Sequence, residues 1–374
     1  MSSAGISAAA QRVAHKPEQP GLDIHKSGTA LFRLLPPNLA HKGAIKALKF
    51  GLVPKLAGFD DSVLAIKLWD IEFPNPVGMS AGFDKNGEVV DGLIDIGFGF
   101  AEAGTVTPLP QPGNPKPNLF RLPDDLALIN RLGFPSDGME AFAANLEKRP
   151  PGANGIVGIN VGINAGTANA TGDIEKGLKK LAHMAGYITI NVSCPNTPGL
   201  CAWQAGDKLS EMVRCAKATL AEICRERTPP LLVKIGPELD DQGLADVAEV
   251  ALNAGIDGLI ACNTTAERPA TLRSEKAMEA GGLSGLPIRQ RATGVVSRLY
   301  ELTGGQIPLI GCGGISTAAD AYERIRAGAS LLQLYTALIY GGPGLVNDIK
   351  RGLAQRLRAD GYTKLSDAVG ANHR

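Results

Sequence analysis

The chain has 374 residues, of which 44% are hydrophobic and 20% charged, and its formal net charge is +1. This length and composition predict one large barrel or two ordinary domains, and they exclude general disorder. A net charge so close to zero gives no reason to expect a nucleic-acid partner.

The metal-binding and membrane-spanning residue patterns are both weak. Six cysteines stand at positions 194, 201, 215, 224, 262 and 312, and no two of them form a CxxC pair. With only five histidines, this spacing argues against a zinc cluster, so we expect no metal. The sequence has no secretory signal, so we expect no disulfide framework. No apolar run reaches the roughly 18 residues of a membrane-spanning helix.

The N-terminal region divides into two parts. Residues 1–28 are small and polar with no sustained period, which predicts a disordered leader. A degenerate transit peptide is the alternative, although Glu18 and Asp23 argue against it. Residues 29–57 instead predict two amphipathic helices, one from Thr29 to a stop at Pro36, and one capped by Asn38 that runs to about Phe50.

The two expected helices suit either of two roles. Their apolar positions are 31, 32, 35, 44, 45 and 48, and their polar face carries Arg33, His41, Lys42, Lys46 and Lys49. A basic face beside an apolar one fits a membrane surface. A hairpin that caps the main domain fits the same pattern equally well.

A repeating unit begins at residue 77. Short apolar runs alternate with helical stretches, and the expected strands are 77–80, 99–104, 155–160, 187–192, 231–235, 258–262, 307–311 and 331–335. Clear helices are expected at 208–225, 241–253 and 318–327. Eight such units predict a (β/α)8 barrel over residues 58–374. A doubly wound sheet is the alternative, weakened because no GxGxxG follows the first strand.

Polar residues recur just past the end of each expected strand, where such barrels carry their functional groups. They are Ala81 to Lys85, Gly104 and Thr105, Asn160, the run 191–196, Lys234, Cys262 to Thr264, Gly311 to Gly314, and Tyr335 with Thr336. Any one of them alone is explained by a turn or a cap. As a set they favour a ligand site.

The glycines among these residues suggest a phosphate. Gly313 and Gly314 follow the seventh strand, and Tyr335 and Thr336 follow the eighth, which is the usual phosphate position of these barrels. Residues 281–285 are expected to add a flexible loop of N–H donors, unless they are an ordinary connection. One phosphate with many amide donors favours FMN over a dinucleotide.

Amides and lysines predict the substrate. Asn130, Asn191, Asn196 and Asn263 match a planar ring edged with amide and carbonyl groups, such as a pyrimidine. Lys85 would bind a carboxylate. Lys234 would be costly to bury unpaired, and we expect it to stabilise negative charge on a reduced flavin.

Cys194 is the candidate general base. A thiol surrounded by donors becomes a thiolate and accepts a proton. A small buried hydrophobe is the commoner fate of a free cysteine, but the neighbouring Asn191, Ser193, Pro195 and Asn196 favour function.

These runs resemble the dihydroorotate dehydrogenase family. The resemblance rests on residues 75–87, 104–108, 111–115, 129–134, 191–200, 263–265, 281–285 and 311–315, which occur in order from about residue 29 to the end. The expected N-terminal helices and the run 120–123 resemble the membrane-associated, quinone-using class 2 branch.

The resemblance implies a role for each matching position. FMN-binding positions are Ala81, Gly82, Phe83, Asp84, Lys85, Thr105, Asn160, Asn191, Lys234, Gly285, Gly314, Tyr335 and Thr336. Dihydroorotate-binding positions are Lys85, Asn130, Arg131, Leu132, Gly133, Phe134, Asn191, Asn196, Asn263 and Thr264. Phe134 and Thr197 match the proton exit, and His41, Arg121 and Tyr335 match the quinone tunnel.

The chain departs from the class 2 pattern at four places. Cys194 stands where that class has a serine base, and Cys262 stands where threonine is usual beside the flavin. Cys201 replaces an arginine, and residues 163–165 replace a run that bears a lysine.

The resemblance implies oxidation of dihydroorotate to orotate in pyrimidine biosynthesis. Cys194 would remove the C5 proton while C6 gives a hydride to the flavin, and a quinone would then take the electrons. We expect peripheral attachment to the cytoplasmic side of a bacterial inner membrane, or alternatively to a mitochondrial inner membrane. The competing hypotheses are a flavin barrel with a fumarate-like acceptor or another pyrimidine, and a non-catalytic FMN-binding protein.

Overall fold

The computed structural model describes residues 24–374, apart from 57–58, 151, 154, 194–202 and 205. Eight parallel strands close into a barrel in the order β3, β4, β7, β8, β9, β10, β12 and β13. They are β3 (Val77–Met79), β4 (Phe100–Val106), β7 (Ile156–Val161), β8 (Tyr187–Asn191), β9 (Leu231–Ile235), β10 (Gly258–Ala261), β12 (Leu309–Cys312) and β13 (Ala329–Leu334). All eight expected strands are confirmed, and the doubly wound alternative is wrong.

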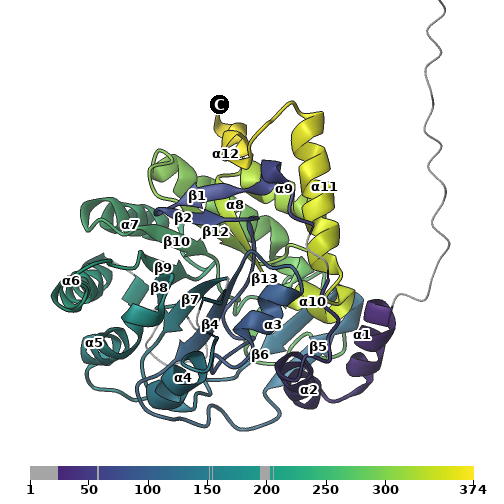
Figure 1. Cartoon of the computed structure of the whole chain (residues 1–374), viewed down its shortest axis with the longest axis horizontal. Coiled ribbons are helices and arrows are strands. Elements are labelled where there is room, and N and C mark those ends of the chain that lie inside the picture. Colours follow the sequence, from purple (N-terminus) through teal and green to yellow (C-terminus); the bar gives the residue numbers. More distant parts are fainter. Residues whose placement is uncertain (1–23, 57–58, 151, 154, 194–202, 205) are drawn as a thin grey trace, which may run out of the picture.

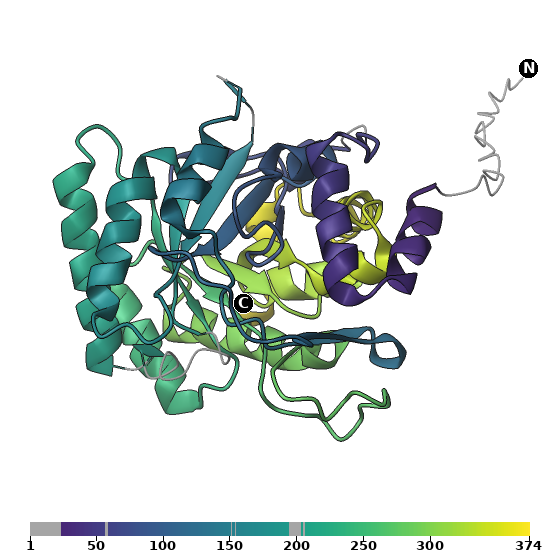
Figure 2. The same ribbon diagram turned by 90° about the horizontal axis from the view of Figure 1, so that it is seen from below.

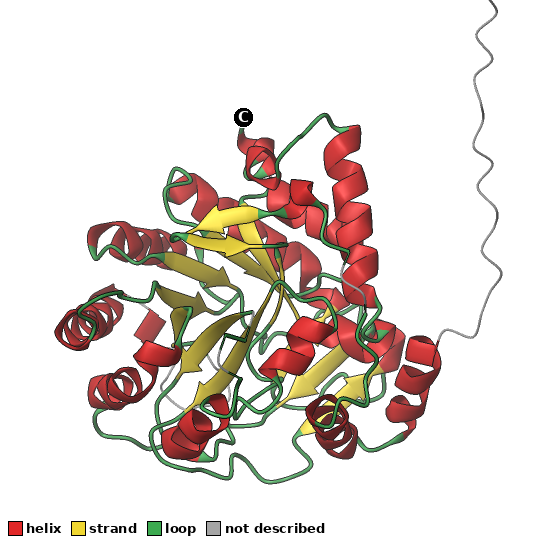
Figure 3. Cartoon of the chain, in the orientation of Figure 1, coloured by secondary structure: helices red, strands yellow, loops and turns green. Residues whose placement is uncertain are grey.

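Helices surround the barrel on its outer face (Figure 3). They are α3 (Val90–Asp95), α4 (Gly138–Leu146), α5 (Ala170–Leu181), α6 (Gly206–Ile223), α7 (Asp241–Asn253), α8 (Arg289–Leu302), α9 (Ala318–Arg326) and α11 (Leu345–Ala359), with the short α10 (Thr336–Gly341) and α12 (Leu365–Ala368). The three helices expected from the sequence correspond to α6, α7 and α9. Their apolar stripes pack on strands that are themselves buried on both faces, which explains the continuous apolar runs.

A small hairpin closes the amino end of the barrel. It joins β1 (Ile66–Leu68) to β2 (Ile71–Phe73) through Trp69 and Asp70, both at positive φ. The Trp69 indole donates to the carbonyl of Asp257, just before β10, at 2.7 Å. The Phe73 ring lies edge-on to Phe100 with centroids 5.4 Å apart. These aromatic rings fill the amino end of the barrel.

A second sheet lies over the carboxyl ends. It consists of β5 (Leu119–Leu122), β6 (Ala127–Asn130) and β11 (Gly282–Gly285), paired antiparallel in the order β11, β6, β5. The expectation that residues 281–285 form a flexible loop is wrong, because Gly282 to Gly285 pair in register with residues 127–130 of β6. Both segments belong to connections that follow barrel strands, β4 and β10, so this sheet forms one wall above the barrel.

Helices α1 (Ile24–Leu34) and α2 (Pro37–Lys49) stand at one side of the barrel, in purple in Figures 1 and 2. Helix α1 begins five residues before the expected Thr29 and packs beside α10, and α2 packs on β5 and α3. Among the described residues we find no helix with the length and apolar character needed to cross a bilayer.

Helix α2 differs from expectation at its N-terminus and agrees with it at its C-terminus. Asn38 does not cap it, since the helix begins at Pro37 and the Asn38 amide instead donates to Asn118 Oδ1 at 3.2 Å. At the other end Gly51 has a φ of +63° and donates to Leu48, and Leu52 donates to Ala47. This double hydrogen bond is a Schellman motif, which explains the glycine behind the helix.

Candidate functional site

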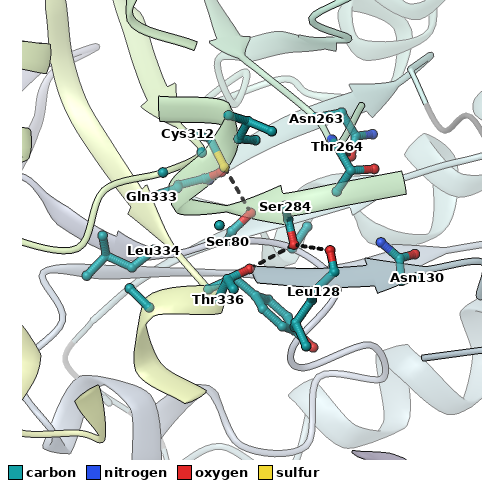
Figure 4. A pocket seen from close by; sticks show the side chains of 18 of the residues that line it. Ser80, Leu128, Asn130, Asn263, Thr264, Ser284, Cys312, Gln333, Leu334 and Thr336 are labelled. Atoms are coloured by element: carbon teal, nitrogen blue, oxygen red, sulfur yellow. Dashed lines mark hydrogen bonds between the residues drawn. The ribbon is translucent and has the colours of Figure 1, made fainter. Parts of the chain in front are cut away.

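A cavity of about 500 Å³ lies at the carboxyl ends of the barrel strands, between the barrel and the β5–β6–β11 sheet. Figure 4 shows Asn130, Asn263 and Thr264 toward one end of it, and Gln333 and Leu334 toward the other. Every barrel strand except β7 contributes to its lining within its bounds or in the segment just after it. This is the position expected for the ligand site of such a barrel.

One end of the cavity is built from glycine backbone. Gly285, Gly313 and Gly314 line it and have φ values of +99°, +100° and +73°. A Cβ added to Gly314 would lie 2.4 Å from the Cα of Arg289, so no side chain fits there without a backbone shift. The hydroxyls of Ser284 and Thr336 lie 2.8 Å apart at the same end. Bare peptide groups and hydroxyls of this kind suit a phosphate.

A hydrogen-bonded network runs from the cavity into the barrel interior. Asn191 Nδ2 donates to Thr105 Oγ1 at 3.0 Å, and Thr105 Oγ1 donates to Asn160 Oδ1 at 2.6 Å. Asn160 Nδ2 then donates to Glu102 Oε1 at 2.7 Å. Both Asn160 and Glu102 have no exposed surface. The amide orientation of Asn160 is therefore fixed from below by a carboxylate.

Glu102 accepts three further hydrogen bonds, two from side chains of β8 and one from a side chain of β13. Its Oε2 accepts from the Tyr187 hydroxyl at 3.0 Å, from Thr189 Oγ1 at 3.2 Å and from Gln333 Nε2 at 2.8 Å. All of its partners are donors, as an ionised carboxylate requires. Burial, followed by the Glu102 charge, raises the pKa of Tyr187 well above its ordinary value. Gln333 lines the cavity, and its Oε1 is buried without a partner in the described part of the chain.

The same network continues toward the substrate end. Ser193 Oγ donates to Asn191 Oδ1 at 3.3 Å, and Asn263 Nδ2 donates to Ser193 Oγ at 3.1 Å. Thr264 N–H closes this side with a bond to Asn263 Oδ1 at 2.8 Å. Because each amide is held by a neighbour, the free faces of Asn191 and Asn263 are presented to the cavity in fixed orientations.

Lys234 brings a positive charge into the barrel mouth. Its side chain is only 4% exposed, and its ammonium donates to Ser80 Oγ at 3.1 Å. The Ser80 hydroxyl lies 3.6 Å from the sulfur of Cys312. No carboxylate pairs with Lys234 among the residues that the structure describes. An anionic or electron-rich ligand group in the cavity would compensate the charge.

Lys85 links this cavity to helix α2. Its Nζ donates to the Gly82 carbonyl at 2.6 Å and lies 3.3 Å from His41 Nε2. Burial lowers the pKa of Lys85 to about 8, partly opposed by Asp84. Burial, followed by the nearby Lys85 charge, lowers the pKa of His41 to about 3. His41 is therefore a neutral acceptor at physiological pH, rather than the solvated helix residue that its sequence position alone suggested.

A second, more apolar cavity of about 310 Å³ lies beneath α1 and α2. His41, Arg121 and Tyr335 all line it. Arg121 holds the end of α1 by donating to the carbonyls of Arg33 at 2.8 Å and Leu35 at 2.7 Å. Tyr335 lines both cavities, and its ring packs edge-on against Phe83 with centroids 5.9 Å apart. The two cavities thus share a wall.

The chain matches the family model described as dihydroorotate dehydrogenase over residues 63–357. The chain belongs to the dihydroorotate dehydrogenase family. A protein of Rhodospirillum rubrum named dihydroorotate dehydrogenase (quinone) is 57% identical over 340 residues, covering 91% of this chain and 92% of that protein. The mitochondrial protein of that name from Mus musculus is 44% identical over 92% of this chain and 89% of its own length.

Solved structures agree with this assignment. A crystal structure of the dihydroorotate dehydrogenase of Eimeria tenella in complex with ferulenol is 41% identical, with a TM-score of 0.88 over 91% of this chain and 96% of that one. The ligand-free form from the same organism has a TM-score of 0.87. Within the dihydroorotate dehydrogenase family, these relatives put the chain in class 2, the quinone branch.

Most of the expected site residues line the first cavity. They are Ala81, Gly82, Lys85, Thr105, Asn130, Leu132, Gly133, Phe134, Asn191, Lys234, Cys262, Asn263, Thr264, Gly285, Gly313, Gly314, Tyr335 and Thr336. Four others lie elsewhere. Phe83 lines the second cavity, and Asn160 lies beneath Thr105. Asp84 caps the backbone N–H groups of Glu88 and Val89, and Arg131 pairs with Glu279 at 2.9 Å.

Three expected site residues, Cys194, Asn196 and Thr197, lie outside the described residues. Cys262 is described, and burial raises the pKa of its thiol to about 12, which favours the protonated thiol. No cluster of three or more metal-ligating side chains occurs within the described ranges.

Sequence reasoning missed several polar residues of the site. Glu102, Ser80 and Gln333 were not expected to contribute, and Ser284 was expected only as part of the 281–285 loop of N–H donors, not for its hydroxyl. Glu102 did carry a signal, since a carboxylate in the middle of an apolar strand has to be paired when both faces of the sheet are buried.

Proposed function

We infer that this chain oxidises dihydroorotate to orotate in pyrimidine biosynthesis, with a hydride passed to FMN and electrons then passed to a quinone. The observation that carries this inference is the pair of adjoining cavities, one polar and one apolar, that share Tyr335. A polar substrate and an apolar acceptor need different surfaces, and a flavin between them has to be reached from both.

FMN is the proposed cofactor, and two observations support the fit. The first is the glycine end of the polar cavity, where Gly314 packs on the Arg289 backbone and no Cβ has room. The second is a pair of buried polar groups that can form further hydrogen bonds with a ligand, namely the Lys234 ammonium and Gln333 Oε1, which has no partner among the described residues. Bound FMN would accept the hydride and release the electrons. Gly285, Gly313, Gly314 and Thr336 would hold its phosphate.

The remaining cavity residues are proposed to bind dihydroorotate. Asn191 and Asn263 offer held amides to a ring edged with carbonyl and N–H groups, together with Asn130 and Thr264. Lys85 offers a positive charge to the substrate carboxylate. Asn196 joins this set from its match to the family pattern. Fixed amides align the ring before reaction, which is the main contribution that a protein makes to such a transfer.

Cys194 is proposed as the base that removes the C5 proton, from its place three residues after Asn191. The Cys194→Ala variant should lose flavin reduction by dihydroorotate, followed by stopped-flow absorbance. Cys194→Ser should be slow at neutral pH and recover only at high pH, because a hydroxyl is a weaker acid than a thiol. An unchanged rate and pH dependence in the alanine variant would show that another group is the base. Phe134 and Thr197 are proposed to line the route by which the proton leaves.

The apolar cavity is proposed to admit the quinone through α1 and α2, with His41, Arg121 and Tyr335 around it. These helices also support peripheral membrane attachment. Leu34 of α1 is 81% exposed and Leu52, three residues after the end of α2, is 73% exposed, and Lys42, Lys46 and Lys49 of α2 are exposed as well. Exposed leucines together with exposed lysines suit an anionic lipid surface. The cytoplasmic face of a bacterial inner membrane, or a mitochondrial inner membrane, is the proposed location.

The deciding experiment mixes the purified protein with dihydroorotate without oxygen, then adds menadione, while the flavin absorbance is recorded. We expect bleaching on the first addition and recovery on the second. Bleaching that fumarate reverses and menadione does not would favour a barrel with another acceptor. A yellow protein that dihydroorotate never bleaches would favour a non-catalytic flavin-binding protein.

A further inference from the structure

Arg324 of α9 is a buried cation behind the glycine end of the polar cavity. Its side chain has no exposed surface. Among the described residues its guanidinium donates to uncharged oxygens, namely the carbonyls of Gly313 at 2.9 Å, Arg289 at 3.2 Å and Cys312 at 3.3 Å, and Thr293 Oγ1 at 3.1 Å. Within the described residues it has no carboxylate partner. A guanidinium remains protonated in proteins, so a full positive charge is buried here.

The local sequence makes room for this side chain. A Cβ on Gly311 would lie 2.5 Å from Arg324 Cγ, so the arginine stem crosses β12 where that strand has no side chain. From there the guanidinium spans two segments, the end of β12 at Cys312 and Gly313, and the start of α8 at Arg289 and Thr293. Arg324 therefore fixes both segments relative to each other.

These hydrogen bonds also orient the peptide groups that face the cavity. In a trans peptide the N–H points away from the carbonyl of the preceding residue. The carbonyls of Cys312 and Gly313 point toward Arg324, so the N–H groups of Gly313 and Gly314 point away from it. Both glycines line the cavity. Arg324 thus turns two backbone donors toward the space where a ligand would lie, and it does so without lining that space itself.

The charges around Arg324 leave this cation uncompensated. The nearby Asp320 carboxylate pairs with Arg289 at 2.8 Å and accepts from the backbone of Ser316 and Thr317. The adjacent Glu323 is exposed, so water screens its charge. An unpaired buried cation is costly. An anion bound at the two glycine N–H groups would remove that cost.

We propose that Arg324 is a positioning residue that makes the cavity select a phosphorylated flavin over the same flavin without its phosphate. This inference rests on the proposed function, since it takes FMN as the cofactor. Arg324 contributes in two ways, by the field of its charge and by the orientation of the Gly313 and Gly314 N–H groups. Both contributions act on the phosphate, and neither acts on the ring system or the ribityl chain.

The test compares FMN with riboflavin on the full-length chain after reversible removal of the flavin. Dissociation constants come from the quenching of flavin fluorescence, for the wild type, Arg324→Gln, Arg324→Lys and the control Arg358→Gln. Arg358 pairs with Asp61 and is more than half exposed. Arg324→Gln should weaken FMN binding by about 10- to 100-fold and riboflavin binding by less than about 3-fold. Arg324→Lys should keep most of the preference for FMN, and the control should match the wild type.

Equal weakening of FMN and riboflavin in both Arg324 variants would overturn the inference, because a residue that only braces the loop would affect both flavins alike. Circular dichroism of each variant checks that it folds. If Arg324→Gln does not fold, the lysine variant decides the question, since it keeps the charge and loses most of the hydrogen bonds. A wild-type protein that binds FMN no better than riboflavin would instead contradict the proposed cofactor.

Discussion

Exchanging the buried carboxylate of Glu102 for an amide, in Glu102→Gln, tests the network that orients the cavity floor. The carboxylate accepts from four side chains, one on Oε1 and three on Oε2. A glutamine replaces one oxygen with an NH₂ group. The less costly orientation directs that NH₂ toward Asn160, because the other would oppose three donors.

The cost of this change follows from the contacts. In the wild type, Asn191 Nδ2 donates to Asn160 Oδ1 at 3.4 Å. In the variant the Asn160 amide has to rotate, so its NH₂ group faces Asn191 Nδ2, and two donors oppose each other. One buried donor is left without an acceptor, at about 1–3 kcal/mol, and three hydrogen bonds to a charged group become ordinary ones. We expect a loss of roughly 2–4 kcal/mol in the free energy of unfolding. We also expect a higher KM for dihydroorotate, because Asn191 loses its fixed orientation.

Urea unfolding followed by circular dichroism measures the first effect, and steady-state kinetics with saturating quinone measures the second. Glu175→Gln is the matched control, since Glu175 pairs with Lys179 on the surface of α5 and should contribute less than about 0.5 kcal/mol. If Glu102→Gln unfolded at the same urea concentration as the control, with an unchanged KM, the network would not hold Asn191 as described.

Three further outcomes are expected. The pKa of Lys85 is lowered to about 8, so its charge is lost as the pH rises through that value. KM for dihydroorotate should then rise about tenfold per pH unit above it, and a flat KM up to pH 10 would contradict the role of Lys85. Arg121→Met removes the hydrogen bonds that hold the end of α1, so KM for the quinone should rise while KM for dihydroorotate stays within about 2-fold. Equal changes in both KM values would show that Arg121 does not act through the apolar cavity. Gly314 has a φ of +73°, and a Cβ there would lie 2.4 Å from the Cα of Arg289, so Gly314→Ala should destabilise the folded protein by at least about 1–2 kcal/mol and reduce flavin retention on gel filtration. In the control Gly294→Ala in α8, nothing lies within 4 Å of the new Cβ, so the folded protein should be stabilised by about 0.5–1 kcal/mol. Similar stability of the two variants would refute this account.

The barrel was predictable because its strands are buried on both faces and therefore appear as apolar runs, such as Leu231–Ile235, which was predicted to the residue. The short antiparallel strands were not. Strands β1, β2, β5 and β6 have only three or four residues, too few to establish an alternating pattern. Strand β11 begins and ends with glycine, and glycines predict loops unless the partner strand is known.

The site residues likewise divide into some that the sequence could predict and some that it could not. Residues at strand ends could be predicted to converge because parallel strands end at one edge, and Asn191, Lys234 and Gly314 do line one cavity. The hydrogen-bond partners of Glu102 and Arg324 could not be predicted, because only the three-dimensional contacts identify the groups that allow a charged side chain to be buried. For His41, a residue of α2, the pKa is lowered by burial and then by the nearby Lys85 charge, and no local sequence pattern contains these tertiary contacts.

The wall that Tyr335 gives to both cavities has a kinetic consequence. If the two substrates are bound on opposite sides of one cofactor, neither has to leave before the other can bind, but they exchange electrons only through that cofactor. Steady-state rates should then give parallel lines in double-reciprocal plots. Compounds that fill the space beneath α1 and α2 would compete with the acceptor and leave the first half-reaction intact. A molecule that blocks growth through this enzyme could therefore be apolar and need not resemble a pyrimidine at all.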